Sequence, residues 1–276
     1  MPDPAGGFPA LPPPQFVKPG RALVAWYSYG PPGGRPLVIC HGLAASALQF
    51  ASDAEYFAAR GYRVMLPELR GHGRSGAPKN PDVKDFAIEA LAADMRAVLG
   101  AANVRRADWV GNSLGGIVGL AMMRDRPECF RSFASFGTAY SMAAPRFPAR
   151  FTPMLYRLFG RRLIAGLTAR ATTRDRQARR LIRHILMRFD PAILPAALTN
   201  LARYDLRDAA LGFAGPILII RGGRDEAVNR VLGPTLTAMR GRSNFTLVDL
   251  PEAGHCANLD ATGATRAALL NHLKPC

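Results

Sequence analysis

The sequence has little lysine, few cysteines and no long hydrophobic run. Only four of its 36 basic residues are lysine, and its four cysteines show neither metal-ligand spacing nor the density of a disulfide scaffold. No apolar run approaches the roughly 18 residues that a membrane span requires. The opening stretch MPDPAGG lacks the basic start and the apolar segment of a signal peptide. We therefore expect a cytoplasmic protein with reduced thiols, no metal site, no cofactor and no membrane span.

The net charge of +16 is concentrated in one part of the chain. Residues 139–190 contain twelve arginines and two aspartates and so carry a local charge of +10. A basic surface attracts phosphates. No helix-turn-helix, zinc or aromatic RNA-binding signature accompanies it, however, and a general bias toward arginine, alanine and proline explains the excess equally well. We expect no nucleic-acid partner.

A serine between glycines is the most informative feature. The stretch Val110–Gly116 reads VGNSLGG, directly after a predicted buried strand at 107–110 and before a predicted buried helix at 117–123. The pattern G-x-S-x-G in this setting is typical of a sharp strand-to-helix turn, because only glycines let the strand and the helix approach closely. Such a turn lifts the Ser113 hydroxyl clear of the sheet. The simpler interpretation is a glycine turn in which Ser113 caps the helix.

Strands and helices alternate on both sides of this turn. The apolar patterns predict strands at 21–29, 36–40, 62–67, 107–110, 131–137, 216–220 and 245–248, and helices at 48–60, 86–99, 117–123, 228–239 and up to 273. This alternation specifies an α/β fold with a doubly wound, mostly parallel sheet. Ligand sites in such sheets lie beyond the carboxyl ends of the strands.

Two segments depart from the alternation. Seven prolines in the first twenty residues predict an extended N-terminal arm, residues 1–20, without a regular element. Residues 139–210 contain helix-like pieces broken by prolines, with no predicted strand, which indicates an all-helical insertion. The core of the fold is then expected at 21–138 and 211–276.

Three residues with catalytic chemistry each follow a predicted strand: Ser113, Asp225 and His255. A serine hydroxyl is a weak nucleophile at neutral pH, so it needs a base within hydrogen-bond distance, and that base needs an orienting carboxylate. Glu226 competes with Asp225 for the last role, and Asp249 is a weaker candidate. The simpler interpretations are a turn-forming Asp225 and a His255 in a surface loop.

With its G-x-S-x-G turn and the order Ser, Asp, His, the chain resembles an α/β-hydrolase from about residue 36 to 273, outside the insertion. The resemblance implies that Ser113 attacks a carbonyl carbon. It implies that His255, in an A-G-H loop, moves the proton and that Asp225, in a G-x-x-D-x-x-V loop, holds the imidazole. The insertion occupies the place of the cap domain that sets specificity in this family.

The resemblance also implies an oxyanion hole. The backbone N–H groups of Leu43, which follows His41 and Gly42, and of Leu114 would bind the oxyanion. His41 is expected to shape its loop, and His72 to pack against or bond to the glycine-rich loop at 68–76.

One position and one short run depart from the family pattern. Glu68 stands where the D-x-R-G-x-G-x-S loop has aspartate, and the run after His255 lacks the usual prolines. Asp260, in that run, is expected to cap the last helix.

These features predict a serine hydrolase that cleaves a carboxylic ester or lactone of a small to medium acyl substrate through an acyl-enzyme on Ser113. In overall organisation the chain resembles enol-lactonase and carboxylesterase relatives. Asn112 is shared with hydrolases of meta-cleavage products, which cut a C–C bond, so that activity is an alternative. A third hypothesis is a non-catalytic scaffold for ligand or protein binding. The sequence leaves the oligomeric state open.

Side chains of the insertion could contact a substrate, although the sequence assigns no binding residue. Arginines there could bind a carboxylate in bidentate fashion, but solvated faces are the simpler interpretation; they are Arg146, Arg150, Arg157, Arg161 and Arg162. Its apolar side chains could face a pocket or pack together; they are Leu155, Leu158, Phe159, Leu163, Ile164, Leu167, Leu181, Ile185 and Phe189.

Overall fold

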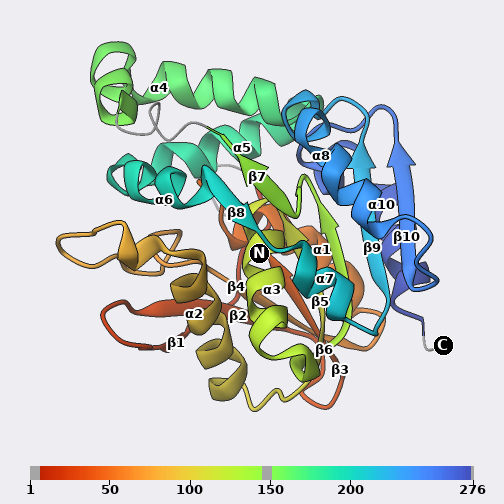
Figure 1. Cartoon of the computed structure of the whole chain (residues 1–276). Coiled ribbons are helices and arrows are strands. Elements are labelled where there is room, and N and C mark those ends of the chain that lie inside the picture. The colour runs from red at the N-terminus through yellow and green to blue at the C-terminus, as the bar shows by residue number, and fades with distance from the viewer. Residues whose placement is uncertain (1–6, 145–150, 275–276) are drawn as a thin grey trace.

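The computed structural model describes residues 7–144 and 151–274, and its centre is an eight-stranded sheet (Figure 1). The strand order is β1-β2-β4-β3-β5-β6-β9-β10; all neighbours from β4 to β10 run parallel, and β1 and β2 join antiparallel at one edge. The doubly wound, mostly parallel α/β sheet is therefore confirmed. The strands are β1 (Gln15–Val17), β2 (Val24–Tyr29), β3 (Arg35–Cys40), β4 (Tyr62–Pro67), β5 (Ala107–Asn112), β6 (Phe130–Phe136), β9 (Ile217–Gly222) and β10 (Phe245–Leu250).

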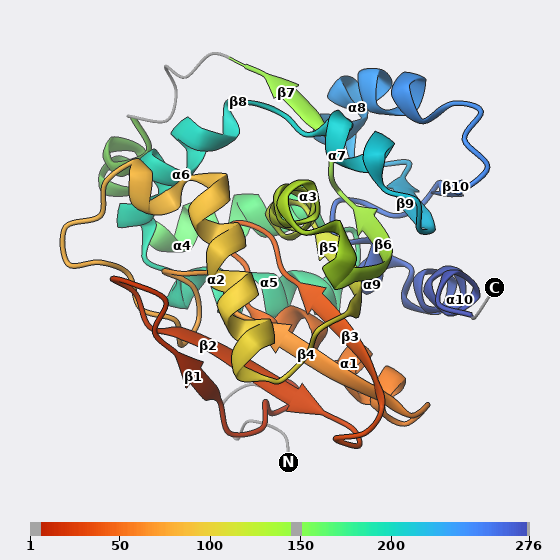
Figure 2. The ribbon, with the colours of Figure 1, turned by 60° about the horizontal axis from the view of Figure 1, so that its bottom comes forward.

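Helices cover both faces of the sheet (Figure 2). Because strand side chains alternate, Trp109 of β5 belongs to the buried cluster on one face, together with Leu120, whereas its neighbour Val110 belongs to the cluster on the other, together with Phe57 and Leu269. The first face carries α2 (Ile88–Ala101), α3 (Leu114–Asp125), α7 (Arg207–Gly212) and α8 (Glu226–Met239). The second carries α1 (Ala51–Ala58), α9 (Ala257–Asp260) and α10 (Thr262–His272), with the short helix η1 (Ala47–Phe50) before α1.

The insertion lies together at one end of the molecule (Figure 1). It contains α4 (Thr152–Thr172), which is broken at Gly160 by a φ of 73°, then α5 (Arg176–Arg188), η5 (Pro191–Ile193) and α6 (Leu194–Leu201). The prediction of no strand at 139–210 is wrong: β7 (Ser141–Ala143) pairs antiparallel with β8 (Arg203–Asp205). The chain leaves and re-enters the core at adjacent points, so the two ends of the segment can pair. Strands of three residues are too short to show a periodicity.

The N-terminal arm also contains an unpredicted element. Gln15–Val17 form β1 on the outer side of β2, although the prolines were expected to exclude any regular structure. Proline is tolerated at a sheet edge, where its missing N–H costs no ladder hydrogen bond, and here the prolines flank the strand rather than interrupt it. None of the helices in the described residues is long and apolar enough to span a bilayer.

The junction of β5 and α3 requires glycine at two positions. A Cβ atom added to Gly111 would lie 2.4 Å from the Cα atom of Gly116, and one added to Gly115 would lie 2.2 Å from the carbonyl oxygen of Cys40 in β3. Both distances are well inside van der Waals contact with backbone. The glycines of the G-x-S-x-G pattern therefore let α3 start directly against β3 and β5.

We expect Gly115→Ala to lower the free energy of unfolding by about 1–3 kcal/mol, because the added methyl group must displace the backbone of β3. Gly100→Ala in α2 is the matched control, since a Cβ atom there meets nothing within 4 Å. The control should leave stability unchanged or raise it by up to about 1 kcal/mol through helix propensity. Urea denaturation of both variants measures the difference, and equal stabilities would contradict the close-approach argument.

Candidate active site

Ser113 adopts a strained backbone at the start of α3. Its φ of 52° and ψ of −118° lie in a region that side chains disfavour, at a cost of about 1–3 kcal/mol. The surrounding backbone holds the turn: the Ser113 N–H donates to Phe136 O, and the Ser113 carbonyl accepts from Gly116 and Ile117. The serine occupies the N-cap position, yet its side chain makes no capping hydrogen bond. The cap interpretation therefore fails, and the hydroxyl remains available for other chemistry.

Asp225 and His255 are in direct contact. The Nδ1 atom of His255 lies 2.8 Å from Oδ2 of Asp225, whose side chain is 6% exposed. The other carboxylate oxygen, Oδ1, accepts from the N–H of Val228 and so caps α8. Asp225 is therefore both a helix cap and a histidine partner, and the helix cap helps to fix the carboxylate that faces the imidazole.

The two competing carboxylates lie elsewhere. Glu226 is exposed on the first turn of α8. Asp249 forms a bidentate ion pair with Arg221, with distances of 2.6 and 2.8 Å. In the described residues, Asp225 is the carboxylate that meets His255.

The histidine loop is bonded to the residue before the serine. Asn112 donates from Nδ2 to the carbonyl oxygens of His255 and Phe136, each at 3.2 Å. Gly137 lies against the imidazole, since a Cβ atom added there would be 2.9 Å from Cε1 of His255. The structure thus places the serine turn and the Asp225–His255 pair at the carboxyl ends of β5, β9 and β10.

Sequence reasoning missed a buried polar chain behind the serine. Gln49 donates from Nε2 to the side-chain oxygens of Asn112 (3.1 Å) and Asn258 (3.2 Å). Asn258 in turn donates to Asp53, which accepts from Arg266 at 2.7 Å. Burial raises the pKa of Asp53. Asparagine and glutamine among the apolar positions of short helices were the signal that could have revealed this chain.

Asp260 has a different role from the one expected. The N-cap of α10 is Ala261, without a side-chain cap, so Asp260 does not cap the last helix. Its carboxylate accepts instead from the backbone of Gly254 (2.8 Å), Arg174 (2.7 Å) and Asp175 (3.1 Å). One carboxylate therefore joins the histidine loop to the segment between α4 and α5. The N–H of Cys256 donates to Thr172 O across the same junction.

The loop after β3 approaches the serine closely. A Cβ atom on Gly42 would lie 3.0 Å from the Cβ atom of Ser113. The Leu43 amide donates to no backbone carbonyl among the described residues. Leu114 is the first residue of α3, so its N–H has no partner within the helix. The two amides that the sequence assigned to an oxyanion hole thus both flank the serine turn without a competing backbone bond.

Two buried histidines support this loop. His41 donates from Nδ1 to Gly42 O and accepts on Nε2 from the N–H of Leu69. His72 accepts on Nε2 from the N–H of Ala44, at 3.0 Å, where the backbone φ is 58°. Burial lowers the pKa of His41 to about 3 and that of His72 to about 4, so both rings stay neutral at physiological pH. His72 also donates from Nδ1 to Arg70 O of the glycine-rich loop, at 2.9 Å, so the expectations for both histidines are confirmed.

The carboxylate of Glu68 binds two backbone amides. Its Oε1 atom accepts from the N–H of Ala47 at 3.2 Å, and Oε2 accepts from the N–H of Arg74. Any Cβ atom on Gly73 would overlap this carboxylate. Burial raises the pKa of Glu68 to about 6.

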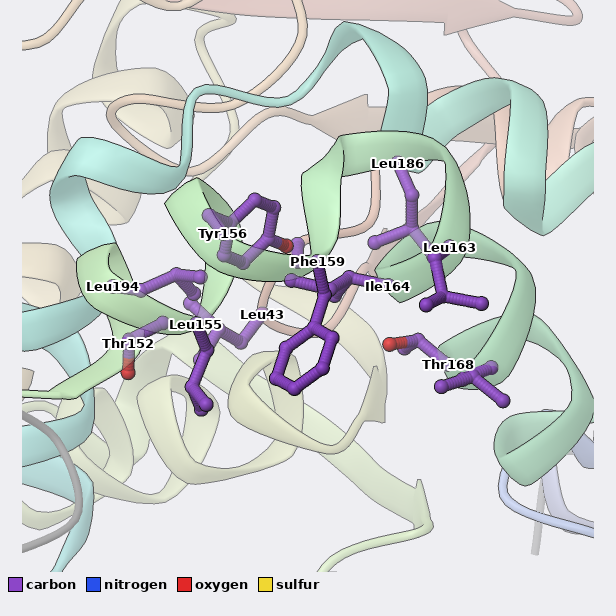
Figure 3. Close-up of a pocket in the computed structure, with 12 residues that line it drawn as sticks. Leu43, Thr152, Leu155, Tyr156, Phe159, Leu163, Ile164, Thr168, Leu186 and Leu194 are labelled. Carbon is purple, nitrogen blue, oxygen red and sulfur yellow. The ribbon is translucent and has the colours of Figure 1, made fainter.

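An apolar cavity of about 570 Å³ lies between α4 and the loop at Leu43 and Ala44 (Figure 3). Five of the nine apolar candidates line it: Leu155, Phe159, Leu163, Ile164 and Leu167. Three others pack in buried clusters instead, namely Leu181, Ile185 and Phe189, and Leu158 points outward with 68% exposure. Leu43 lines this cavity, whereas Ser113, Asp225 and His255 do not, and most of its walls are hydrocarbon.

None of the described candidate arginines lines this cavity. Arg157 and Arg162 are exposed, and Arg161 donates to Met187 O at 3.1 Å. Arg146 and Arg150 lie outside the described residues. The described arginines therefore give no support to carboxylate binding inside the cavity.

We expect His72 to make stability fall in acid. The pKa of His72 is about 4 in the folded chain and about 6.5 in the unfolded chain. The contribution of the neutral ring to the free energy of unfolding is therefore present above pH 6.5 and is lost as the pH falls toward 4. His72→Gln removes this titration. The stability difference between wild type and variant should shrink by about 2 kcal/mol between pH 7 and pH 5, as measured by urea denaturation. Since all other groups are shared, a constant difference would show that His72 is not held neutral.

Comparisons with known proteins agree with this architecture. A family model described as alpha/beta hydrolase fold matches residues 35–262. The chain is 27% identical over 277 residues to the dihydrolipoyllysine-residue acetyltransferase component of an acetoin cleaving system from Pseudomonas putida, covering 95% of this chain and 70% of that protein. It is 27% identical over 224 residues to a pimeloyl-(acyl-carrier protein) methyl ester esterase from Yersinia pestis, covering 76% of this chain and 83% of that protein. The enol-lactonase structure from Burkholderia xenovorans LB400 is similar with a TM-score of 0.82 and 21% identity, over 94% of this chain and 99% of that one. The chain belongs to the alpha/beta hydrolase fold family.

Proposed function

We propose that this protein is a serine hydrolase of carboxylic esters or lactones, with Ser113, His255 and Asp225 as its catalytic triad. The observation that carries the proposal is the Asp225–His255 hydrogen bond of 2.8 Å beside a strained, uncapped serine. The named activities of an esterase and an enol-lactonase among similar proteins support the ester-type bond.

The contacts define the proton path. A carboxylate only accepts, so Asp225 holds the proton of His255 on Nδ1 and leaves Nε2 free to act as the base. His255 takes the Ser113 proton while the serine oxygen attacks the carbonyl carbon. The tetrahedral oxyanion binds the N–H groups of Leu43 and Leu114. His255 then returns the proton to the leaving alkoxide, which gives the acyl-enzyme, and a water molecule repeats the sequence to release the acid.

The apolar cavity indicates the substrate class. Its hydrocarbon walls and its contact with Leu43 suit a small to medium acyl group whose carbonyl lies near the oxyanion amides. We assign residues 139–210 the role of a cap over the core at 21–138 and 211–276, with the arm at 1–20 outside both. The bonds of Asp260 to Gly254 and Arg174 support a cap joined to the histidine loop.

Asn112 no longer favours C–C bond hydrolysis. Its side chain is 2% exposed and is bonded to His255, Phe136 and Gln49, so positioning of the histidine loop explains it. We therefore place ester or lactone hydrolysis first. A non-catalytic scaffold would need neither the strained serine nor the oriented histidine.

Ser113→Ala should lower kcat at least about a thousandfold on p-nitrophenyl butyrate without changing the fold, because the nucleophile is lost. A fluorophosphonate probe should label Ser113 in the wild type. Ser243→Ala, on an exposed loop, is the matched control and should keep full activity. An unlabelled Ser113 together with unchanged turnover would refute the enzyme hypothesis. Turnover of a vinylogous 1,5-diketone, with none of the ester, would favour C–C cleavage instead.

The neighbouring carboxylates provide a second test. Asp225→Asn should reduce kcat by about 10³–10⁴-fold, because an amide can no longer hold the imidazole in the required tautomer. Glu226→Gln changes the same charge one residue later and should have little effect, since Glu226 is exposed. Steady-state kinetics of the pair gives the comparison. A larger loss in the Glu226 variant would reassign the third member of the triad.

A further inference from the structure

The exposed surface of α4 is unusually apolar for a surface helix. Six of the ten large hydrophobic residues that are exposed in the described chain lie on this one helix, with exposures of 43–68%. They are Met154, Leu155, Leu158, Phe159, Leu163 and Leu167. The positions at 154, 158 and at 163, 167 are spaced by four, so each half of the helix presents a stripe rather than scattered side chains. A contiguous apolar surface of this kind marks an interaction site.

A strongly basic groove lies next to this stripe. Six arginines of α4 and α5 line a hollow of about 480 Å³: Arg162, Arg170, Arg176, Arg179, Arg180 and Arg183. Leu163 and Leu167 contribute to the same hollow. Within the described chain, no aspartate or glutamate lines it, and none forms an ion pair with these arginines. Six of the twelve arginines of residues 139–190 therefore line one hollow beside the apolar stripe. The two helices that carry them, α4 and α5, lie next to each other (Figure 1).

We propose that the outer face of α4 and α5 docks on an anionic phospholipid bilayer. A helix surface that combines exposed leucine and phenylalanine with arginines suits the boundary between headgroups and acyl chains. The apolar stripe would enter the hydrocarbon edge, and the arginine groove would lie among lipid phosphates.

Other occupants fit this surface less well. A second copy of the chain, seated face to face, would bring two unneutralised arginine grooves together and would be repelled. A nucleic acid would satisfy the arginines but would leave Met154 and Leu158 against a hydrated phosphate backbone. A bilayer supplies partners for both kinds of side chain.

The docking face continues into the apolar cavity. Four of the six exposed residues also line the cavity, together with Leu43 (Figure 3); they are Leu155, Phe159, Leu163 and Leu167. If the proposed hydrolase function holds, a bilayer at this face would lie against the mouth of the cavity proposed to hold the acyl group. This extension rests on the proposed function, whereas docking itself does not.

Vesicle sedimentation with the full-length Ser113→Ala chain tests docking without turnover. The chain should pellet with vesicles of phosphatidylcholine mixed with phosphatidylglycerol, should bind at least about tenfold less to phosphatidylcholine alone, and should be released by salt, because ions screen the arginines. Arg180→Glu with Arg183→Glu should reduce binding about tenfold or more. Arg105→Glu with Arg240→Glu makes the same charge change on exposed arginines elsewhere and should leave binding intact.

A second double variant separates bilayer docking from simple charge attraction. Met154→Gln with Leu158→Gln removes apolar area that does not line the cavity and should weaken vesicle binding, while binding to duplex DNA stays unchanged. The proposal is overturned in favour of a general polyanion surface if the double variant binds vesicles as tightly as the parent chain does. The same holds if the parent chain binds vesicles and duplex DNA with equal affinity. Dimerisation abolished by the same variant would overturn it in favour of a second copy. If the wild-type chain binds vesicles as expected but hydrolyses no ester, that result contradicts only the proposed function.

Discussion

The backbone contact between α3 and strands β3 and β5 is the constraint on which the site depends. Gly115 lies so close to the Cys40 carbonyl that no side chain fits, and Gly111 is equally close to Gly116. This packing starts the helix immediately after the strand and forces Ser113 into a positive φ. The strain, about 1–3 kcal/mol, is offset by buried helix and sheet packing on both sides. The position of the hydroxyl is thus a consequence of how tightly a helix and a sheet can approach.

The histidine loop is held from three directions. Asp225 binds the imidazole, Asn112 binds the backbone carbonyl of His255, and Asp260 binds the amide of Gly254. The Asp260 carboxylate also accepts from Arg174, at the start of the link to α5. The proposed base is therefore connected by hydrogen bonds to the serine strand, to the carboxylate strand and to the insertion.

The insertion combines two surfaces with different chemistry. An apolar cavity lies between α4 and the loop at Leu43, and exposed apolar side chains of α4 form part of its wall. A groove lined by six arginines of α4 and α5 lies next to it. Both surfaces share α4, which bends at Gly160. A single helix thus relates the proposed acyl site to the proposed membrane surface, and the basic composition of this segment gains a physical role that composition alone did not supply.

The sequence by itself determined most strands and helices of the core, the serine turn and the sequence positions of Ser113, Asp225 and His255, because period-two and helical apolar patterns and paired glycines are local signals. It missed the three-residue strands β1, β7 and β8. Only the tertiary structure decided which carboxylate meets His255, since Glu226 is adjacent in sequence but points to solvent. It also decided the bond between Asn112 and His255, which joins residues 143 positions apart, and the pairing of β7 with β8. Such contacts arise when separate elements pack together, so neither residue of a pair carries the information alone.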